Sequence, residues 1–115
     1  MSRCEDDAKL LTSRGKVPLW LIPREPLELV ARAFEFGLRL PGRSAYGWRK
    51  SGIKASDYIS AANRHEAAWM GREENASDSN VHHLAHEIAT KLILLDSILC
   101  GRLTDDRPPK VEPNK

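Results

Sequence analysis

The chain has little that would support a disulfide framework, a membrane span or a nucleic-acid surface. Its two cysteines, Cys4 and Cys100, are spaced for neither a disulfide scaffold nor a zinc knuckle. No apolar run approaches the roughly 20 residues that cross a bilayer, and the first residues lack the apolar stretch of a signal peptide. Basic residues exceed acidic ones by only two, so no dedicated nucleic-acid surface is expected. These absences predict a cytoplasmic protein with reduced thiols.

A length of 115 residues suits one compact domain. We expect a flexible N-terminus over residues 1–14, a single helical domain over 15–104, and a Pro-rich, charged, disordered tail over 105–115. At the start of the domain, GKVPLWLIP (15–23) contains two prolines, which favour an extended segment anchored by Trp20.

Three stretches have the apolar spacing of amphipathic helices, and no stretch has a convincing strand pattern. In the first, the stripe Leu27, Val30, Ala31, Phe34 and Leu38 is expected to face the core. The chain is therefore predicted to be an all-α protein, a small bundle of about three main helices with an extended N-terminal segment. The expected helices run from about Glu25 to Pro41, from Ser56 or Asp57 as N-cap to Met70, and from Asn80 to Leu99.

The third expected helix is apolar on more than one side. Its main stripe, widened by neighbouring alanines, is Val81, Leu84, Ile88, Leu92, Leu95 and Leu99. A small domain buries such a helix most readily against another copy of itself. We therefore predict a homodimer or a larger homo-oligomer whose helices complete the bundle.

Histidines open the third helix. At 100° per residue, His83, His86 and Glu87 lie on one side of it, and His65 lies on an inward face of the second helix. Two imidazoles and a carboxylate one turn apart can hold a divalent metal or position a water for hydrolysis. The competing interpretation is that these imidazoles lie on the surface or are satisfied core residues. The acids of the preceding loop, Glu73, Glu74 and Asp78, are close to this helix in sequence.

The loop between the first two helices contains YGWRK. Trp48 is suited to stack on a nucleotide base, and Arg49 and Lys50 to neutralise phosphates, with Arg64 adding charge. In the alternative interpretation, Trp48 packs as a lid over the helices and the basic side chains are solvated.

The order of these motifs resembles a phage protein family, the N-terminal domain of dATP/dGTP diphosphohydrolases. The resemblance rests on GKVPLWLIP, PLELVARAFEFG, GWRKSG, SDYISAANRHEAAW, HLAHEIATKLILLDSIL and DDRP. It implies an all-helical domain that hydrolyses a purine deoxynucleoside triphosphate, dGTP or dATP, to the monophosphate and pyrophosphate. It also implies a divalent metal, Mg²⁺ or alternatively Mn²⁺, and a location in the host cytoplasm if the protein is phage-encoded.

Particular positions follow from this resemblance. The catalytic candidates are His65, His83 and His86, which match the family's histidines. The substrate-binding candidates are Trp48, Arg49, Lys50, Tyr58 and Arg64, and the candidate metal ligands are Asp78, His83, His86 and Glu87. The chain departs from the family pattern at Asn75 and at Asp78-Ser79-Asn80, where the family has Asp and Glu-Ser-Gly. These departures favour the alternative function of a non-catalytic protein that binds and sequesters a nucleotide or a signalling molecule.

Overall fold

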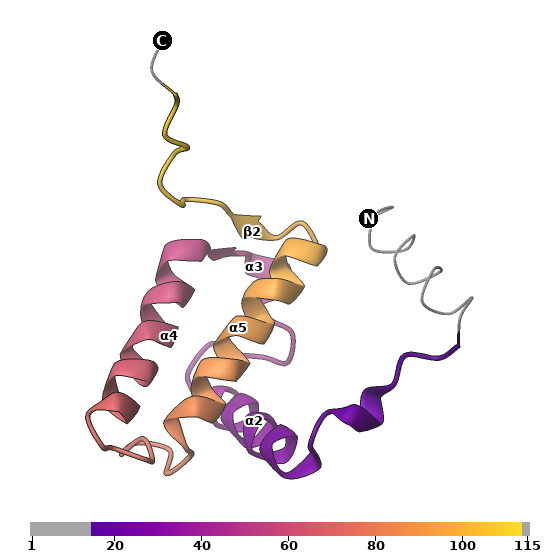
Figure 1. Cartoon of the computed structure of the whole chain (residues 1–115), viewed down its shortest axis with the longest axis vertical. Helices are drawn as coiled ribbons and strands as arrows, with labels where there is room; N and C mark the ends of the chain where they lie inside the picture. The colour runs from indigo at the N-terminus through magenta and orange to yellow at the C-terminus, as the bar shows by residue number, and fades with distance from the viewer. Residues whose placement is uncertain (1–14, 114–115) are drawn as a thin grey trace.

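The computed structural model describes residues 15–113, so the expected flexible N-terminus (1–14) lies outside the described residues. The long helix α5 is flanked by α4 on one side and by α2 on the other (Figure 1). The all-α class is confirmed, because the remaining elements are short. In chain order they are a 3-10 helix η1 (Leu19–Leu21), α2 (Arg24–Gly37), α3 (Trp48–Ser51), β1 (Ile53–Lys54), α4 (Ala55–Met70), α5 (His83–Leu99) and β2 (Leu103–Thr104).

The core is thin and consists mainly of small side chains. Val30 and Ala33 of α2 pack against Ala85 and Ala89 of α5, with Phe34 and Val81 at the edge of this cluster. On the other side of α5, Ala62 and Ser97 are fully buried. Small residues let the helix axes approach closely, but each contributes little apolar burial. None of the described helices is long and apolar enough to cross a bilayer.

The orientation of α5 leaves its main apolar stripe uncovered by the rest of the chain. The side chains it buries include His83, Glu87, Leu94 and Ser97. Most of the leucine stripe expected to form its main packing face is exposed, with Ile88 at 45% and Leu95 at 54%. The side with the histidines therefore faces the protein, and the apolar stripe faces solvent in the single chain.

The first helix also differs from the prediction, in its end and in its packing. It stops at Gly37 instead of near Pro41, because the amides of Arg39 and Leu40 bond to carbonyls three residues back, as in a 3-10 turn. A residue before proline is disfavoured in helical conformation, which helps to end the helix. Leu27 and Leu38 of the expected stripe are about half exposed.

The start of α4 is held by the chain that follows α5. The expected N-caps, Ser56 and Asp57, do not cap it; the N-cap residue is Lys54, whose side chain makes no cap bond. The carboxylate of Asp106 instead accepts hydrogen bonds from the backbone N–H of Ser56, at 2.9 Å, and from its hydroxyl. Next to this cap, β1 pairs in parallel with β2, with Ile53 opposite Leu103.

A glycine makes this pairing possible. Gly52, just before β1, has a φ of 74°, a backbone conformation that other residues rarely adopt. A Cβ at this position would lie 3.0 Å from the carbonyl oxygen of Arg102, which accepts a hydrogen bond from Ile53. These two-residue strands were not expected from the sequence.

Candidate functional site

Three histidines from two helices meet where α4 faces the first half of α5. Nδ1 of His65 on α4 lies 2.8 Å from Nδ1 of His83 on α5. The ring of His65 also stacks on that of His86, with the centroids 4.8 Å apart and the planes 9° from parallel. Of the predicted catalytic residues, His65 therefore contacts both His83 and His86.

Glu73, in the loop between α4 and α5, extends this contact into a chain of hydrogen bonds. Its Oε1 lies 2.6 Å from Nε2 of His83, whose side chain is buried. An ionised carboxylate only accepts hydrogen bonds, so Nε2 of His83 donates to Glu73. When His83 carries a single proton, Nδ1 is left as an acceptor. His65 then donates through Nδ1–H, which leaves the lone pair on its Nε2. This assignment of tautomers follows from the hydrogen-bond network.

Two of these histidines are held in their neutral form. Burial is the main cause that lowers the pKa of His65, and the neighbouring His86 and His83 lower it further. Burial also lowers the pKa of His86. The carboxylate of Asp78 opposes both shifts without reversing either. A neutral imidazole with a free lone pair is the form that takes a proton from water.

The loop from Arg72 to Asn80 holds His86, which stacks on His65, through a hydrogen bond. The hydroxyl of Ser79 lies 2.6 Å from Nε2 of His86 and accepts a hydrogen bond from the backbone N–H of Val81. His82, the remaining histidine, caps α5, because its Nδ1 accepts from the N–H of Leu84 at 3.0 Å. His82 therefore caps α5 and is not part of the hydrogen-bond chain from Glu73 to His65.

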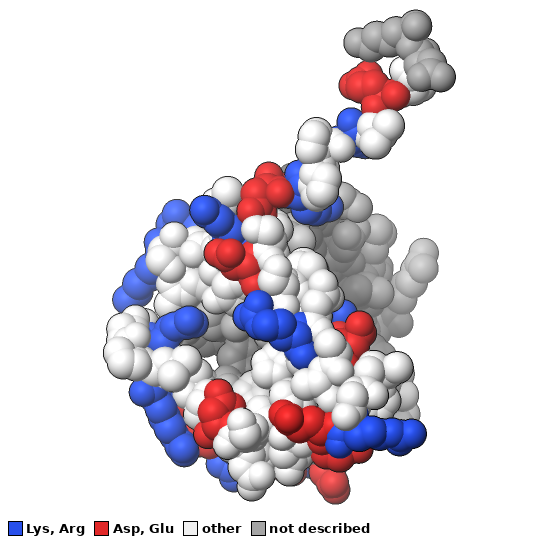
Figure 2. Space-filling model, turned by 90° about the vertical axis from the view of Figure 1, so that its left-hand side faces the viewer, with Lys and Arg blue, Asp and Glu red and all other residues white. Residues whose placement is uncertain are grey.

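An open groove borders the histidines. It runs between α4, α5 and the loop that contains α3. On this side of the molecule a hollow has Lys and Arg side chains at its left and right and Asp and Glu side chains above and below it (Figure 2). The groove brings together most of the residues that the sequence predicted for the site. These are Trp48, Arg49, Lys50, Tyr58, Arg64, His65, Asp78 and His86.

The carboxylate of Asp96 on α5 accepts hydrogen bonds from two of the predicted substrate-binding residues. It accepts from the indole N–H of Trp48 at 2.7 Å and from two nitrogens of Arg49 at 2.9 and 2.7 Å. These hydrogen bonds, from Arg49 first and Trp48 second, lower the pKa of Asp96 to about 2. Arg49 also lies over the ring of Tyr46, at 4.6 Å. Arg49 and Trp48 therefore hold α3 against α5.

Lys50 and Arg64 are more available to a ligand. Both line the groove, both are exposed, and neither forms an ion pair with any residue in the range 15–113. Arg43 and Lys54 share these three features, so four cations along the groove are available to meet phosphate oxygens, and two of them were predicted.

The four candidate metal ligands are not assembled into a metal site. Both nitrogens of His83 are engaged, one by His65 and the other by Glu73. Glu87 is buried and accepts a hydrogen bond from Lys91 at 3.1 Å. Within residues 15–113, no three His, Cys, Asp or Glu side chains lie together in an arrangement that could hold a metal ion. The donor geometry of this set therefore does not fit a protein-held metal.

Sequence reasoning did not select Glu73, Ser79 and Asp96 as site residues. Glu73 and Ser79 come from an irregular loop, and the only signal was that REENASDSN immediately precedes the histidine-bearing helix. Asp96 lies 13 residues beyond His83 on α5, and nothing in its local sequence indicates that it would accept from Trp48 and Arg49.

The fold and the site together define a class of protein. This is a small helical protein with a groove lined by basic side chains, beside a hydrogen-bonded chain of one carboxylate and two imidazoles in which His83, the middle member, is buried. A family model described as dATP/dGTP diphosphohydrolase, N-terminal, matches residues 6–107. The match covers most of the chain, so the protein belongs to this family. A search of curated proteins and a search of solved structures each gave no match.

Proposed function

We propose that the protein hydrolyses a purine deoxynucleoside triphosphate, dGTP or dATP, to the monophosphate and pyrophosphate, with His65 as the general base. The hydrogen-bond chain from Glu73 through His83 to His65 carries this proposal. It ends at a lone pair on Nε2 of a groove-lining histidine whose pKa is lowered. The family name supports nucleotide hydrolysis in general.

In the proposed reaction, Nε2 of His65 removes a proton from a water molecule. The water oxygen attacks the α-phosphorus, and the bond from that phosphorus to the oxygen of the leaving pyrophosphate breaks. The proton on Nε2 leaves a positive charge on His65. The lone pair on Nδ1 of His83 and the carboxylate of Glu73 stabilise that charge through the hydrogen bonds between them.

The groove supplies the binding groups. Lys50 and Arg64 would contact the phosphates, because both line the groove, are exposed and have no carboxylate partner within residues 15–113. Tyr58 and the ring of Trp48 would contact the base. Arg49 would contribute only by exchanging Asp96 for a phosphate, so we assign it mainly to holding α3 in place.

A divalent metal, Mg²⁺ or Mn²⁺, remains part of this proposal as a component of the substrate. Nucleoside triphosphates bind such ions through their own phosphate oxygens, so the metal would arrive with the substrate. We assign no step of the mechanism to a metal held by Asp78, His83, His86 and Glu87, because these side chains are not assembled to hold one.

The direct test measures pyrophosphate release from each common nucleoside triphosphate with Mg²⁺ or Mn²⁺. His65→Asn should lower kcat by about 10² to 10⁴, the usual contribution of a general base. The matched control is His82→Asn, which removes a histidine outside the chain and keeps an amide oxygen able to cap α5. This control should retain kcat within about threefold.

The binding-only alternative makes a different prediction for the same samples. Calorimetry would then detect a nucleotide bound in the groove, and Arg64→Met would weaken that binding, while no product forms from any nucleotide with either metal. That result would refute hydrolysis and leave nucleotide sequestration as the function.

A further inference from the structure

The large apolar side chains of this protein lie mainly on its surface. The largest side chain that is fully buried in the described chain is that of Ser97, and the core cluster contains three alanines. A folded domain normally derives most of its stability from burying Leu, Ile and aromatic side chains. One copy alone therefore leaves much of its apolar surface in contact with water.

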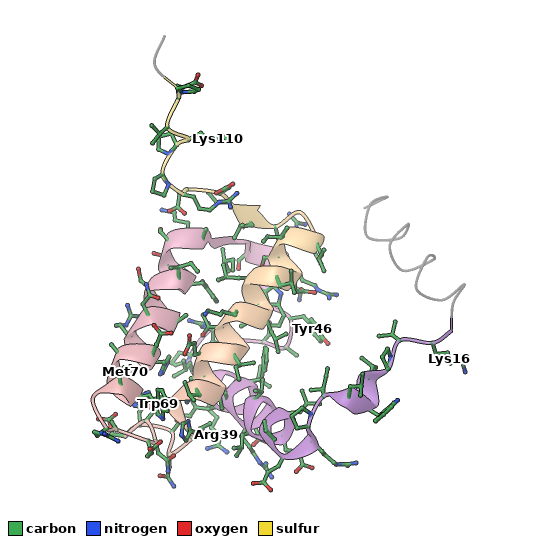
Figure 3. All side chains as sticks on the ribbon, viewed as in Figure 1. Lys16, Arg39, Tyr46, Trp69, Met70 and Lys110 are labelled. Carbon is green, nitrogen blue, oxygen red and sulfur yellow. The ribbon has the colours of Figure 1, made fainter. Side chains whose placement is uncertain are left out.

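Two exposed apolar surfaces stand out. The first, here called the arm, is residues 17–22, which leave the helices before α2 and extend away from them (Figures 1 and 3). Trp20 at its centre is 82% exposed, and Leu19 and Leu21 are 69% and 63% exposed. The second, here called the α5 stripe, consists of Ile88, Leu92, Leu95 and Leu99, each at least 36% exposed.

We propose that these two surfaces bind each other between two copies of the chain, so that the arm of each copy packs along the α5 stripe of the other. In one copy the arm extends outward, and none of its described residues is buried. An isologous dimer pairs both surfaces twice by a single twofold operation. Exchange of an arm needs no new fold and is a common route to a homodimer.

We assign a second copy of the chain, and not an unrelated protein, as the partner of these surfaces. The apolar surface that one copy leaves exposed is needed for the stability of the fold itself. A partner that covers it must be present whenever the chain folds, and another copy always is. The available area is also appropriate. The nine large apolar side chains of the arm and the stripe offer on the order of 500 Å² of apolar surface per copy. With a polar rim, this approaches the roughly 800 Å² per partner of a standard interface.

The interface would also reach the groove. Leu92 belongs to the α5 stripe and lines the groove near the histidines, so the partner's arm would lie at its edge. The proposal itself does not depend on hydrolysis, and its test requires no nucleotide.

Sedimentation equilibrium or light scattering at micromolar concentration should report a dimer for the full chain. Trp20→Ala in the arm and Leu95→Glu in the α5 stripe should each raise the dimer Kd by at least about tenfold. Met70→Glu is the control, because Met70 is 70% exposed at the far end of α4 and lies away from both surfaces (Figure 3). It should leave the Kd within about threefold.

Trp20→Ala keeps the test decisive if Leu95→Glu fails to fold, because no contact within one copy depends on a side chain that is 82% exposed. A monomeric wild-type chain would overturn the proposal. A dimer that Trp20→Ala does not weaken would overturn the role of the arm.

Cross-linking separates exchange between copies from folding back within one copy. Cys4 is first replaced by Ser; one batch keeps the exposed Cys100, next to Leu99, and the other carries Cys100→Ser and Lys16→Cys, next to the arm, so that both surfaces keep their apolar side chains. After mixing, a bismaleimide should link the two kinds of chain covalently. A chain that carries both cysteines and yields only an internally linked monomer would show that the arm covers its own helix, contrary to the proposal.

Discussion

Glu73→Gln tests the proposed proton path by changing one acceptor into a donor. In the wild type, Glu73 only accepts, which places the proton of neutral His83 on Nε2. A glutamine can turn its NH₂ group toward Nε2 instead. His83 then carries its proton on Nδ1 and donates to Nδ1 of His65, so the proton of His65 moves to Nε2 and the lone pair at that nitrogen is lost.

The structure separates the expected effect on rate from the effect on stability. The Glu73 side chain is 55% exposed, so losing its contact with His83 should cost only about 1 kcal/mol of unfolding free energy. The base, in contrast, would be in the wrong tautomer, and kcat should fall by about 10² to 10⁴. A group whose removal impairs the reaction far more than the fold is a positioning residue and not a structural one.

The assay measures pyrophosphate release beside a thermal melt, and ¹⁵N NMR of the imidazoles provides a readout that does not need turnover. The wild type should show His83 protonated on Nε2 and His65 on Nδ1, with both assignments reversed in the variant. Wild-type spectra that place the proton of His65 on Nε2 would refute the assigned chain even if hydrolysis were found. A variant that retains more than about a third of wild-type kcat would refute the role of Glu73.

Three further predictions concern the fold around the site. Because the folded protein lowers the pKa values of His65 and His86 below the ordinary 6.5, the unfolded chain binds more protons below that pH. The free energy of unfolding should therefore decrease as pH falls below about 6.5, and in denaturant titrations this slope should be smaller for His65→Asn. Asp96→Ala should cost about 1–2 kcal/mol, seen as a lower melting temperature, because an indole N–H and a guanidinium lose their acceptor. Gly52→Ala should cost about 1–3 kcal/mol from its positive φ and the nearby Arg102 carbonyl, and a melting temperature equal to wild type would contradict this.

The sequence predicted the long helices better than the short elements. The apolar period places α4 and α5 within a few residues of their observed bounds, because each has several turns over which a pattern can repeat. The four residues of α3 and the paired strands β1 and β2 have no such pattern. They are held by distant groups, Asp96 for α3 and Asp106 beside β1, and distant partners cannot be read from a local stretch of sequence.

The part of the site that lies on the long helices could be predicted from their periodic pattern. Helical phase placed His83 and His86 on one side of α5 and His65 on an inward face of α4, and the structure brings these rings together. Glu73 reaches His83 from a loop whose path depends on positive φ values at Arg72 and Asn80. Hydrophobicity alone identified the leucine stripe of α5, but it did not indicate that Ile88 and Leu95 would be exposed in the single chain.

The return of the chain after α5 affects how the protein can be cut and fused. Asp106 caps α4 from 50 positions downstream, and β2 pairs with the residues just before that helix. A chain that ended at Leu99 would keep all of α5. It would nevertheless lose the Asp106 carboxylate that holds the first turn of α4, so that turn would loosen. Toward the C-terminus, a protease acting on the native protein should spare the stretch through Asp106 and cleave beyond it, so reporter tags on that side belong after Asp106.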